Sequence, residues 1–198
     1  MYEQILRLQS FSEAETREII KSSLKALANL HQRGVIHRDI KPENLLICPN
    51  SQSLVKLADF GFATYCKPGE KVLGSCGSPS YVAPDILSQK PYDSKSDLWS
   101  LGVIMFLLCF GELPFYSEDA KEQFNLIKTE DLPTQLMSDG YASPEACDLV
   151  RKLLVKSGEE RLSAEEALNH PWFQVDLPKF DKSIFESVKE VATSAVAK

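Results

Sequence analysis

The sequence lacks an apolar run long enough to cross a membrane. Its most apolar stretch, WSLGVIMFLLCF at residues 99–110, is shorter than the roughly 20 residues that a transmembrane helix needs, so we expect a buried core helix and no membrane partner. The N-terminal MYEQILRLQS carries an acidic residue and no small-residue cleavage site after an apolar run, so a secretory signal is not indicated.

The chain also lacks a cluster of basic residues and any pairing among its cysteines. The formal net charge is −6, whereas nonspecific nucleic-acid binding depends on clustered Lys and Arg, so we expect no nucleic-acid partner. The cysteines are odd in number and lack metal-ligand spacing, which favours a reducing, intracellular and most simply cytoplasmic location. The five are Cys48, Cys66, Cys76, Cys109 and Cys147.

What is present is the composition of an ordinary globular protein. Apolar residues make up 43% and charged residues 25% of the 198 residues, which suits one domain or one large lobe with its own core. No internal repeat or low-complexity tract interrupts it.

Helical signals dominate the chain. Ser12 and Glu15 form a capping-box pattern before an apolar face that ends at Gly34, which predicts a helix over about residues 13–32. A buried helix is predicted at 97–110 because it is apolar on nearly every face. Further helix starts are predicted by SPEA at 143–146, for a helix over 144–155, and by Ser163 with Glu166.

Two short β-prone segments, residues 45–48 and 54–57, flank the turn-rich PNSQS and predict a hairpin. This hairpin places Asp39 before one strand and Asp59 after the other. Residues 59–92 are rich in Gly and Pro and predict a long loop, and long ordered loops in compact domains are usually functional.

Three motifs occur in a fixed order: HRDIKPEN at 37–44, DFG at 59–61 and APD at 83–85. With these motifs the chain resembles the C-terminal lobe of a eukaryotic protein kinase. The resemblance implies a mainly α fold, a protein-kinase-like C-terminal lobe. In this lobe a helix bundle carries a short β-hairpin with the catalytic and DFG loops. The N-terminal lobe is expected to be absent. It covers residues 1–174 and leaves residues 175–198 as a tail that we expect to be helical.

The resemblance implies phosphoryl transfer with ATP and Mg²⁺ as cofactors. Asp39 would orient the incoming hydroxyl and accept its proton, Lys41 would neutralise charge on the transferring phosphoryl group, and Asn44 completes the catalytic set. Asn44 and Asp59 would be the Mg²⁺ ligands, because Mg²⁺ prefers hard oxygen atoms. The implied nucleotide contacts are Lys41, Glu43, Asn44, Leu46 and Asp59, with Leu46 forming the floor under the adenine ring.

Other matches imply structural support. His37 and Phe60 resemble a buried pair that links the catalytic loop to DFG, which Gly61 completes. Asp97 resembles the carboxylate that accepts backbone N–H groups of the catalytic loop, and the alternative is a simple acid at a helix N-terminus, favoured by the helix dipole.

Arg161 resembles the arginine that pairs with the last acid of A-P-E. That acid is Asp85 here, which is one methylene shorter than glutamate. The pair therefore either survives with a small backbone shift or is loosened.

The KPEN form of the catalytic loop resembles serine/threonine kinases. Three further segments resemble the calcium/calmodulin-dependent kinase group, including the calcium-dependent kinases of plants and protists: GSPSYVAPD at 77–85, GELPFY at 111–116 and HPWF at 170–173. In that group the acid at Glu43 often meets a basic residue before the phosphoacceptor, so we expect protein substrates with basic residues before the phosphoacceptor, with a solvated or structural glutamate as the alternative. Ser78 occupies the position whose hydroxyl approaches Asp39 and Lys41.

The activation segment departs from this group. Gly74 stands where a phosphorylated threonine is common, and Arg38 would normally clamp that phosphate. We expect an activation segment that does not depend on phosphorylation at 74, with phosphorylation of Ser75 as the alternative.

A larger departure lies upstream of the catalytic loop. The 36 residues before His37 contain neither a G-x-G-x-x-G-x-V loop nor a V-A-I-K lysine, so the cleft is expected to have one wall and the isolated chain to be weak or inactive. MYEQILRL resembles the interior of the helix after the kinase hinge, so Met1 is interpreted as an internal methionine of a longer kinase or the start of a truncated product.

In the tail, Ser183 and Glu186 predict a capping box followed by a helical apolar stripe. A helix folded back on the lobe, or a frayed terminus, is one interpretation and a regulatory segment the other, although its mixed charges do not resemble a basic calmodulin target. A regulatory partner is left open.

Three functional hypotheses follow. The first is a serine/threonine protein kinase that transfers the γ-phosphate of ATP to protein substrates. The second is an inactive kinase-derived binding or scaffold module, and the third is a fragment without independent function.

Overall fold

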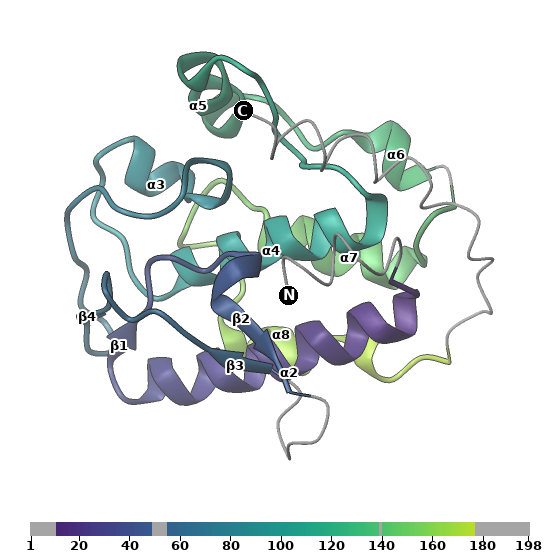
Figure 1. The fold of residues 1–198 in the computed structure, drawn as a ribbon, viewed down its shortest axis with the longest axis horizontal. Helices are drawn as coiled ribbons and strands as arrows, with labels where there is room; N and C mark the ends of the chain where they lie inside the picture. The colour runs from purple at the N-terminus through teal and green to yellow at the C-terminus, as the bar shows by residue number, and fades with distance from the viewer. Residues whose placement is uncertain (1–10, 49–54, 139, 177–198) are drawn as a thin grey trace.

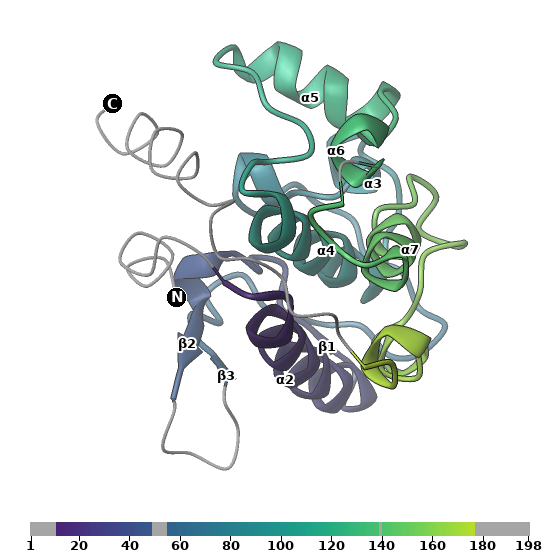
Figure 2. The same ribbon diagram turned by 90° about the vertical axis from the view of Figure 1, so that its right-hand side faces the viewer.

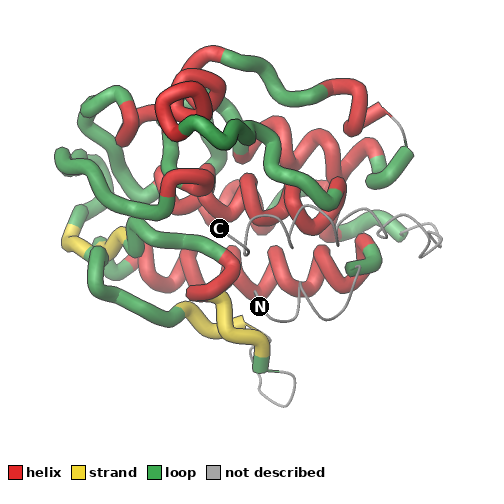
Figure 3. The backbone as a smooth tube through the Cα atoms, turned by 45° about the horizontal axis from the view of Figure 1, so that its top comes forward, coloured by secondary structure: helices red, strands yellow, loops and turns green. Residues whose placement is uncertain are grey.

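Helices make up about half of the structure, a computed structural model that describes residues 11–48, 55–138 and 140–176 (Figure 3). Two small sheets lie beside the helices, and each has two strands. This arrangement agrees with the expected mainly α fold with a short β-hairpin. Three of the sequence-based expectations concern other residues: the MYEQILRL helix, the PNSQS turn and the Ser183–Glu186 capping box lie outside the described residues.

The first described helix, α2 (Glu13–Gln32), begins and ends where the sequence predicts. The Ser12 hydroxyl accepts the backbone N–H of Glu15 at 3.2 Å, and the Glu15 carboxylate accepts the N–H of Ser12 at 2.8 Å. Gly34 follows the C-cap with φ +69°, a left-handed conformation that glycine adopts without strain. The capping box and the C-terminal glycine therefore fix both ends of the helix.

The core is built around α4 (Lys95–Phe110), which lies between α2 and α7 (Figures 1 and 2). Nearly all of its side chains are buried, as its continuous apolar sequence predicts. At Gly102 the helix approaches α7 so closely that an added Cβ would lie 2.9 Å from the Cβ of Leu153. A side chain at this position would therefore push the two helices apart.

The remaining helices surround this core. The caps predicted from the sequence are present: Ser143 accepts the N–H of Ala146, and Ser163 forms a capping box with Glu166. The sequence analysis did not predict α5 and α6. The helices are α3 (Pro84–Leu87), α5 (Ala120–Thr129), α6 (Thr134–Ser138), α7 (Pro144–Leu153) and α8 (Ala164–Leu168), with short 3₁₀ turns η1 (Pro42–Asn44), η2 (Pro79–Tyr81) and η3 (Pro171–Phe173).

The predicted hairpin is formed by β2 (Leu45–Ile47) and β3 (Val55–Leu57), which pair antiparallel with Leu45 opposite Leu57. A second pair, β1 (Val35–Ile36) with β4 (Thr64–Tyr65), was not predicted. Both of its strands have two residues, too few to show a period-two pattern in the sequence.

The prediction of one long loop over residues 59–92 is wrong in part. This segment contains β4, η2 and α3, and the backbones of Val72 and Tyr92 exchange two hydrogen bonds of 2.8 and 3.0 Å. These pairings join residues far apart in the chain, so local sequence patterns do not reveal them. The segment is therefore anchored at several points along its length.

Within the described residues, no helix is both long enough and apolar enough to span a membrane.

Candidate functional site

The site is centred on the carboxylate of Asp39, which lies just before η1 and is buried. Its Oδ1 accepts the Ser78 hydroxyl at 2.9 Å, and its Oδ2 lies 2.8 Å from the Lys41 amine and 3.2 Å from the Asn44 amide nitrogen. Lys41 also donates to the Ser78 hydroxyl at 3.0 Å. Burial acts to raise the pKa of Asp39, but these hydrogen bonds outweigh it and hold the pKa below its usual value. The carboxylate is therefore ionised at neutral pH.

The loop at residues 37–44 is held in place by Asp97, on the first turn of α4. Its two carboxylate oxygens accept the backbone N–H groups of His37 at 2.9 Å and Arg38 at 2.8 Å. Arg38 has φ +69°, a left-handed conformation that is strained for a residue with a side chain. Charge-assisted hydrogen bonds to a buried carboxylate offset this strain.

The loop is also fixed by a ring contact that departs from the expectation of a buried pair. The His37 and Phe60 rings are 4.9 Å apart, and His37 lies 3.0 Å from the Ala58 carbonyl oxygen through its Nε2. His37 is fully buried, but Phe60 is 49% exposed. The expectation was therefore wrong for Phe60, because the described residues around its ring leave about half of the side chain exposed.

Asn44 and Asp59 lie at the same end of the β2–β3 hairpin, since the Asn44 carbonyl accepts the N–H of Ala58 at 2.9 Å. The Asn44 amide nitrogen donates to the backbone and side chain of Asp39, which leaves its oxygen as the atom suited to a metal. Asp59 is exposed, has φ +59°, and accepts the N–H of Gly61 at 3.2 Å. An amide oxygen beside an exposed carboxylate fits the hard oxygen ligands of Mg²⁺.

No group of three or more His, Cys, Asp and Glu side chains suited to a metal occurs among the described residues. A site made by Asn44 and Asp59 would therefore depend on further oxygen atoms from a substrate and water, as is usual for Mg²⁺ bound with a nucleotide.

Glu43 and Leu46, the other implied nucleotide contacts, both face solvent. Leu46 is 46% exposed on β2, and Glu43 is exposed on η1. The apolar surface of Leu46 is therefore available to a flat ligand or a partner.

The side chain of Arg38 reaches the activation segment. Its Nε donates to the Phe62 carbonyl at 2.7 Å, and its Nη1 donates to the Tyr92 hydroxyl at 3.3 Å. Burial raises the pKa of Tyr92, so this hydroxyl stays protonated at neutral pH. Gly74 has φ +125° and lies in open space, and Ser75 is exposed.

The sequence did not point to Tyr92, although a buried tyrosine usually has a partner for its hydroxyl. Nor did it point to His31, whose Nε2 lies 2.8 Å from Asp97. Neither residue stands in a recognisable motif. Their roles follow from the packing of α2 and of the activation segment against the catalytic loop.

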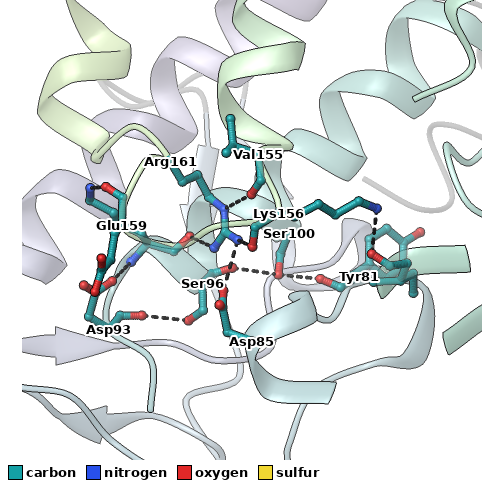
Figure 4. Close-up of polar contacts among 11 residues, drawn as sticks. Tyr81, Asp85, Asp93, Ser96, Ser100, Val155, Lys156, Glu159 and Arg161 are labelled. Atoms are coloured by element: carbon teal, nitrogen blue, oxygen red, sulfur yellow. Dashed lines mark hydrogen bonds and ion pairs between the residues drawn. The ribbon is translucent and has the colours of Figure 1, made fainter. Parts of the chain in front are cut away.

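Arg161 and Asp85 form the expected pair, with Nη2 and Oδ2 3.1 Å apart. Arg161 is almost fully buried and also donates to the carbonyl oxygens of Val155, Lys95 and Lys156 (Figure 4). A Cβ on Gly158 would lie 3.0 Å from the Asp85 carboxylate, so the loop approaches Asp85 closely. The shorter acid therefore still reaches the arginine.

These features together define a loop that presents an aspartate, a lysine and an asparagine, and the HRDIKPEN, DFG and APD motifs follow one another along the chain. Residues 1–173 match the family described as Protein kinase domain. The chain belongs to this family.

Two relatives come from Dictyostelium discoideum. Myosin light chain kinase A is 36% identical over 197 residues, which cover 96% of this chain and 67% of that protein. A probable myosin light chain kinase is 36% identical over 174 residues, which cover 87% of this chain but only 44% of that protein. The chain thus spans between less than half and two thirds of the length of these relatives.

Proposed function

We propose that this chain is the catalytic C-terminal lobe of a protein serine/threonine kinase that uses ATP and Mg²⁺, with residues 1–174 in the lobe and 175–198 as its tail. The observation that carries the proposal is the group of donors around the buried Asp39 carboxylate. The family membership of the chain supports the same conclusion.

In this mechanism Asp39 accepts a hydrogen bond from the hydroxyl of the protein substrate and orients its oxygen toward the phosphoryl group. The Ser78 hydroxyl, 2.9 Å from Oδ1, supports this role because it demonstrates that a hydroxyl donor can approach Asp39. A carboxylate with a lowered pKa is a weak base, so the main contribution of Asp39 is to orient the substrate hydroxyl. Asp39 takes up the hydroxyl proton as the new phosphorus–oxygen bond forms.

Lys41 contributes positive charge 2.8 Å from Asp39, where it would neutralise negative charge on a phosphoryl group transferred beside that carboxylate. Asn44 holds Asp39 and keeps its own oxygen available for Mg²⁺, with Asp59 as the second protein ligand. Bound MgATP would supply the phosphoryl group and the cation that neutralises its charge.

The substrate class is proposed from the resemblance to the calcium/calmodulin-dependent group. Glu43 is exposed on η1 and is suited to a basic residue before the acceptor Ser or Thr. The names of the two relatives make a myosin light chain the first protein substrate to test.

Activation without phosphorylation at residue 74 is proposed as well. Arg38 already donates to the Phe62 carbonyl and the Tyr92 hydroxyl, so uncharged groups engage its guanidinium. Phosphorylation of Ser75 remains the rival mechanism, and replacing Ser75 with Ala tests it: unchanged activity supports the first mechanism.

The test uses the longest form of the protein present in its own cells, purified and incubated with Mg²⁺, labelled ATP and a myosin light chain. Replacing Asp39 with Asn should lower phosphate transfer by about 10²-fold to 10⁴-fold while the thermal unfolding profile stays cooperative. Replacing the exposed Glu112 with Gln, also a carboxylate-to-amide change, should leave the rate unchanged. Equal rates for the Asp39→Asn variant and the wild type would refute the catalytic role. Peptides that differ only in a Ser, Thr or Tyr acceptor test the serine/threonine assignment.

A second candidate is a binding or scaffold module without catalysis. The exposed apolar side chains of Leu46, Phe60 and Phe62, which are 46%, 49% and 48% exposed, favour it because such a surface often marks an interaction site. Two results together would support this function. No cellular form of the protein would transfer phosphate, and a bound partner protein would be lost when Leu46 is replaced with Glu.

A further inference from the structure

A cavity of about 540 Å³ is lined by the Arg161–Asp85 pair and by Tyr92, and Asp39 does not line it. Its walls come from α3, the linker between α3 and α4, the end of α5 and the loop between α7 and α8, with Lys71 added from the activation segment. This volume is within the usual range for ligand sites. The lining is rich in charged side chains: Lys71, Asp85, Lys90, Asp93, Lys128, Lys156, Glu159 and Arg161.

Two of the five lining cations are neutralised within the protein. Lys71 lies 2.9 Å from Glu159, and Arg161 lies 3.1 Å from Asp85. The third lining carboxylate, Asp93, accepts the backbone N–H of Lys95 at 2.8 Å.

The other three cations, Lys90, Lys128 and Lys156, have no ion pair with a described residue. They come from three different walls: Lys90 from the α3–α4 linker, Lys128 from the last turn of α5, and Lys156 from the loop after α7. The chain as a whole has a net charge of −6, so a cavity with an excess of positive charge is a local feature that overall composition does not explain.

The surroundings of Lys156 show that the positive charge of the cavity is only partly balanced by the protein. Its amine donates to the Ile127 carbonyl at 2.7 Å and lies 3.9 Å from the centre of the Phe115 ring. Figure 4 shows its side chain extending away from the Arg161 network. Burial lowers its pKa to about 8, and the nearby carboxylates of Asp131 and Glu130 oppose this shift only in part. An anion in the cavity would supply the missing charge.

We propose that this cavity binds an acidic peptide segment, a run of Asp and Glu residues in a partner protein. Lysine ammonium groups act as point charges and suit several separate carboxylates, whereas a single planar anion is better matched by arginine. The half-open rim with exposed Lys90 and Lys128 accepts a chain that passes across it.

The position of the cavity suggests which proteins carry the segment. The chain runs from Ser78 through η2 directly into α3, whose residues line the cavity. An acidic segment held there would keep its own protein beside Asp39 and raise the effective concentration of a phosphoacceptor. That the partner is a substrate rests on the proposed kinase function, but the binding itself does not.

The test measures binding of a fluorescein-labelled peptide of alternating Glu and Ala to the 198-residue chain by anisotropy, at about 50 mM salt. Saturable binding is expected, and a peptide with Gln in place of Glu should not bind. The double variant Lys90→Gln/Lys128→Gln should weaken binding by at least about tenfold.

The matched control is Lys25→Gln/Lys121→Gln, which removes two exposed helical lysines outside the cavity and the same total charge. It should bind within about twofold of the wild type. Equal weakening by both double variants would reveal nonspecific attraction and overturn the proposal, as would unchanged binding by the cavity variant. Tighter binding of inorganic phosphate alone than of the peptide would overturn the peptide assignment.

An Asp39→Asn chain separates this proposal from the kinase function. It should bind the acidic peptide as tightly as the wild type, because Asp39 does not line the cavity. If the peptide binds but no cellular form of the protein transfers phosphate, the partner is not a substrate of a kinase reaction. The proposal that the cavity binds an acidic segment would still hold.

Discussion

The ion pair between Arg161 and Asp85 offers the sharpest test of the packing described above. The Arg161 side chain is fully buried and Asp85 is 18% exposed. Burial lowers the pKa of Arg161, but its guanidinium remains protonated at neutral pH. Replacing Arg161 with Met would leave Asp85 without its cation and would remove a hydrogen-bond donor from three backbone carbonyl oxygens.

Removing one partner of a buried pair lowers the free energy of unfolding by about 3–5 kcal/mol. Asp85→Asn should lower it by about 2 kcal/mol, because Asp85 is partly hydrated and the Arg161 hydrogen bonds to carbonyl oxygens remain. The double variant should be about as unstable as Arg161→Met alone. The coupling free energy between the two positions is then about 2 kcal/mol.

Urea unfolding followed by the fluorescence of the two buried tryptophans, Trp99 and Trp172, provides the measurement. The control is the surface pair Lys152–Asp148, which has a similar separation of 2.8 Å but side chains that are 47% and 48% exposed. Lys152→Met should lower stability by at most about 1 kcal/mol. Additive effects of the Arg161 and Asp85 changes, or an equal loss at the surface pair, would refute the reasoning.

Three further predictions concern the catalytic loop, the core and pH. Asp97→Asn should lower the free energy of unfolding by about 3 kcal/mol, because the two loop amides lose a charged acceptor; unchanged hydrogen exchange at these amides would contradict it. Gly102→Ala should lower the melting temperature, since overpacking against Leu153 by about 1–3 kcal/mol exceeds the gain in helix propensity; a higher melting temperature would count against this packing. Folding lowers the pKa of Lys156 from 10.5 to about 8, so between these pH values the unfolded chain binds more protons and stability rises with pH. Relative to Lys156→Met, the wild type should gain about 1 kcal/mol between pH 7 and 10 after allowance for solvent screening, and a constant difference measured by urea unfolding would exclude this effect.

Local signals in the sequence were sufficient for several elements. The caps at Ser12, Ser143 and Ser163 predicted helix starts correctly, because a cap depends on residues within one turn. The apolar run of α4 predicted a central buried helix, since no face of it could be left in water. The short strands β1 and β4 escaped prediction because each gains its stability from a distant partner.

The candidate site divides in the same way. Sequence motifs identified Asp39, Lys41 and Asn44 as neighbours on one loop, and this neighbourhood follows from their spacing alone. Lys41 and Asn44, its neighbours on the loop, lower the pKa of Asp39, and the hydroxyl of Ser78, which the fold brings from the activation segment, lowers it further. The exposure of Phe60 likewise could not be inferred, because burial depends on every segment that packs nearby.

The sequence by itself determined the helix ends, the order of the motifs and the chemical groups of the proposed active site, because these depend on residues close together in the chain. Only the tertiary structure decided how the strained loop at Arg38 is held by Asp97, how Tyr92 engages that arginine, and that lysines from three separate segments surround one cavity. Each of these depends on distances between residues that are remote in the chain, and such distances are set by the packing of the whole core.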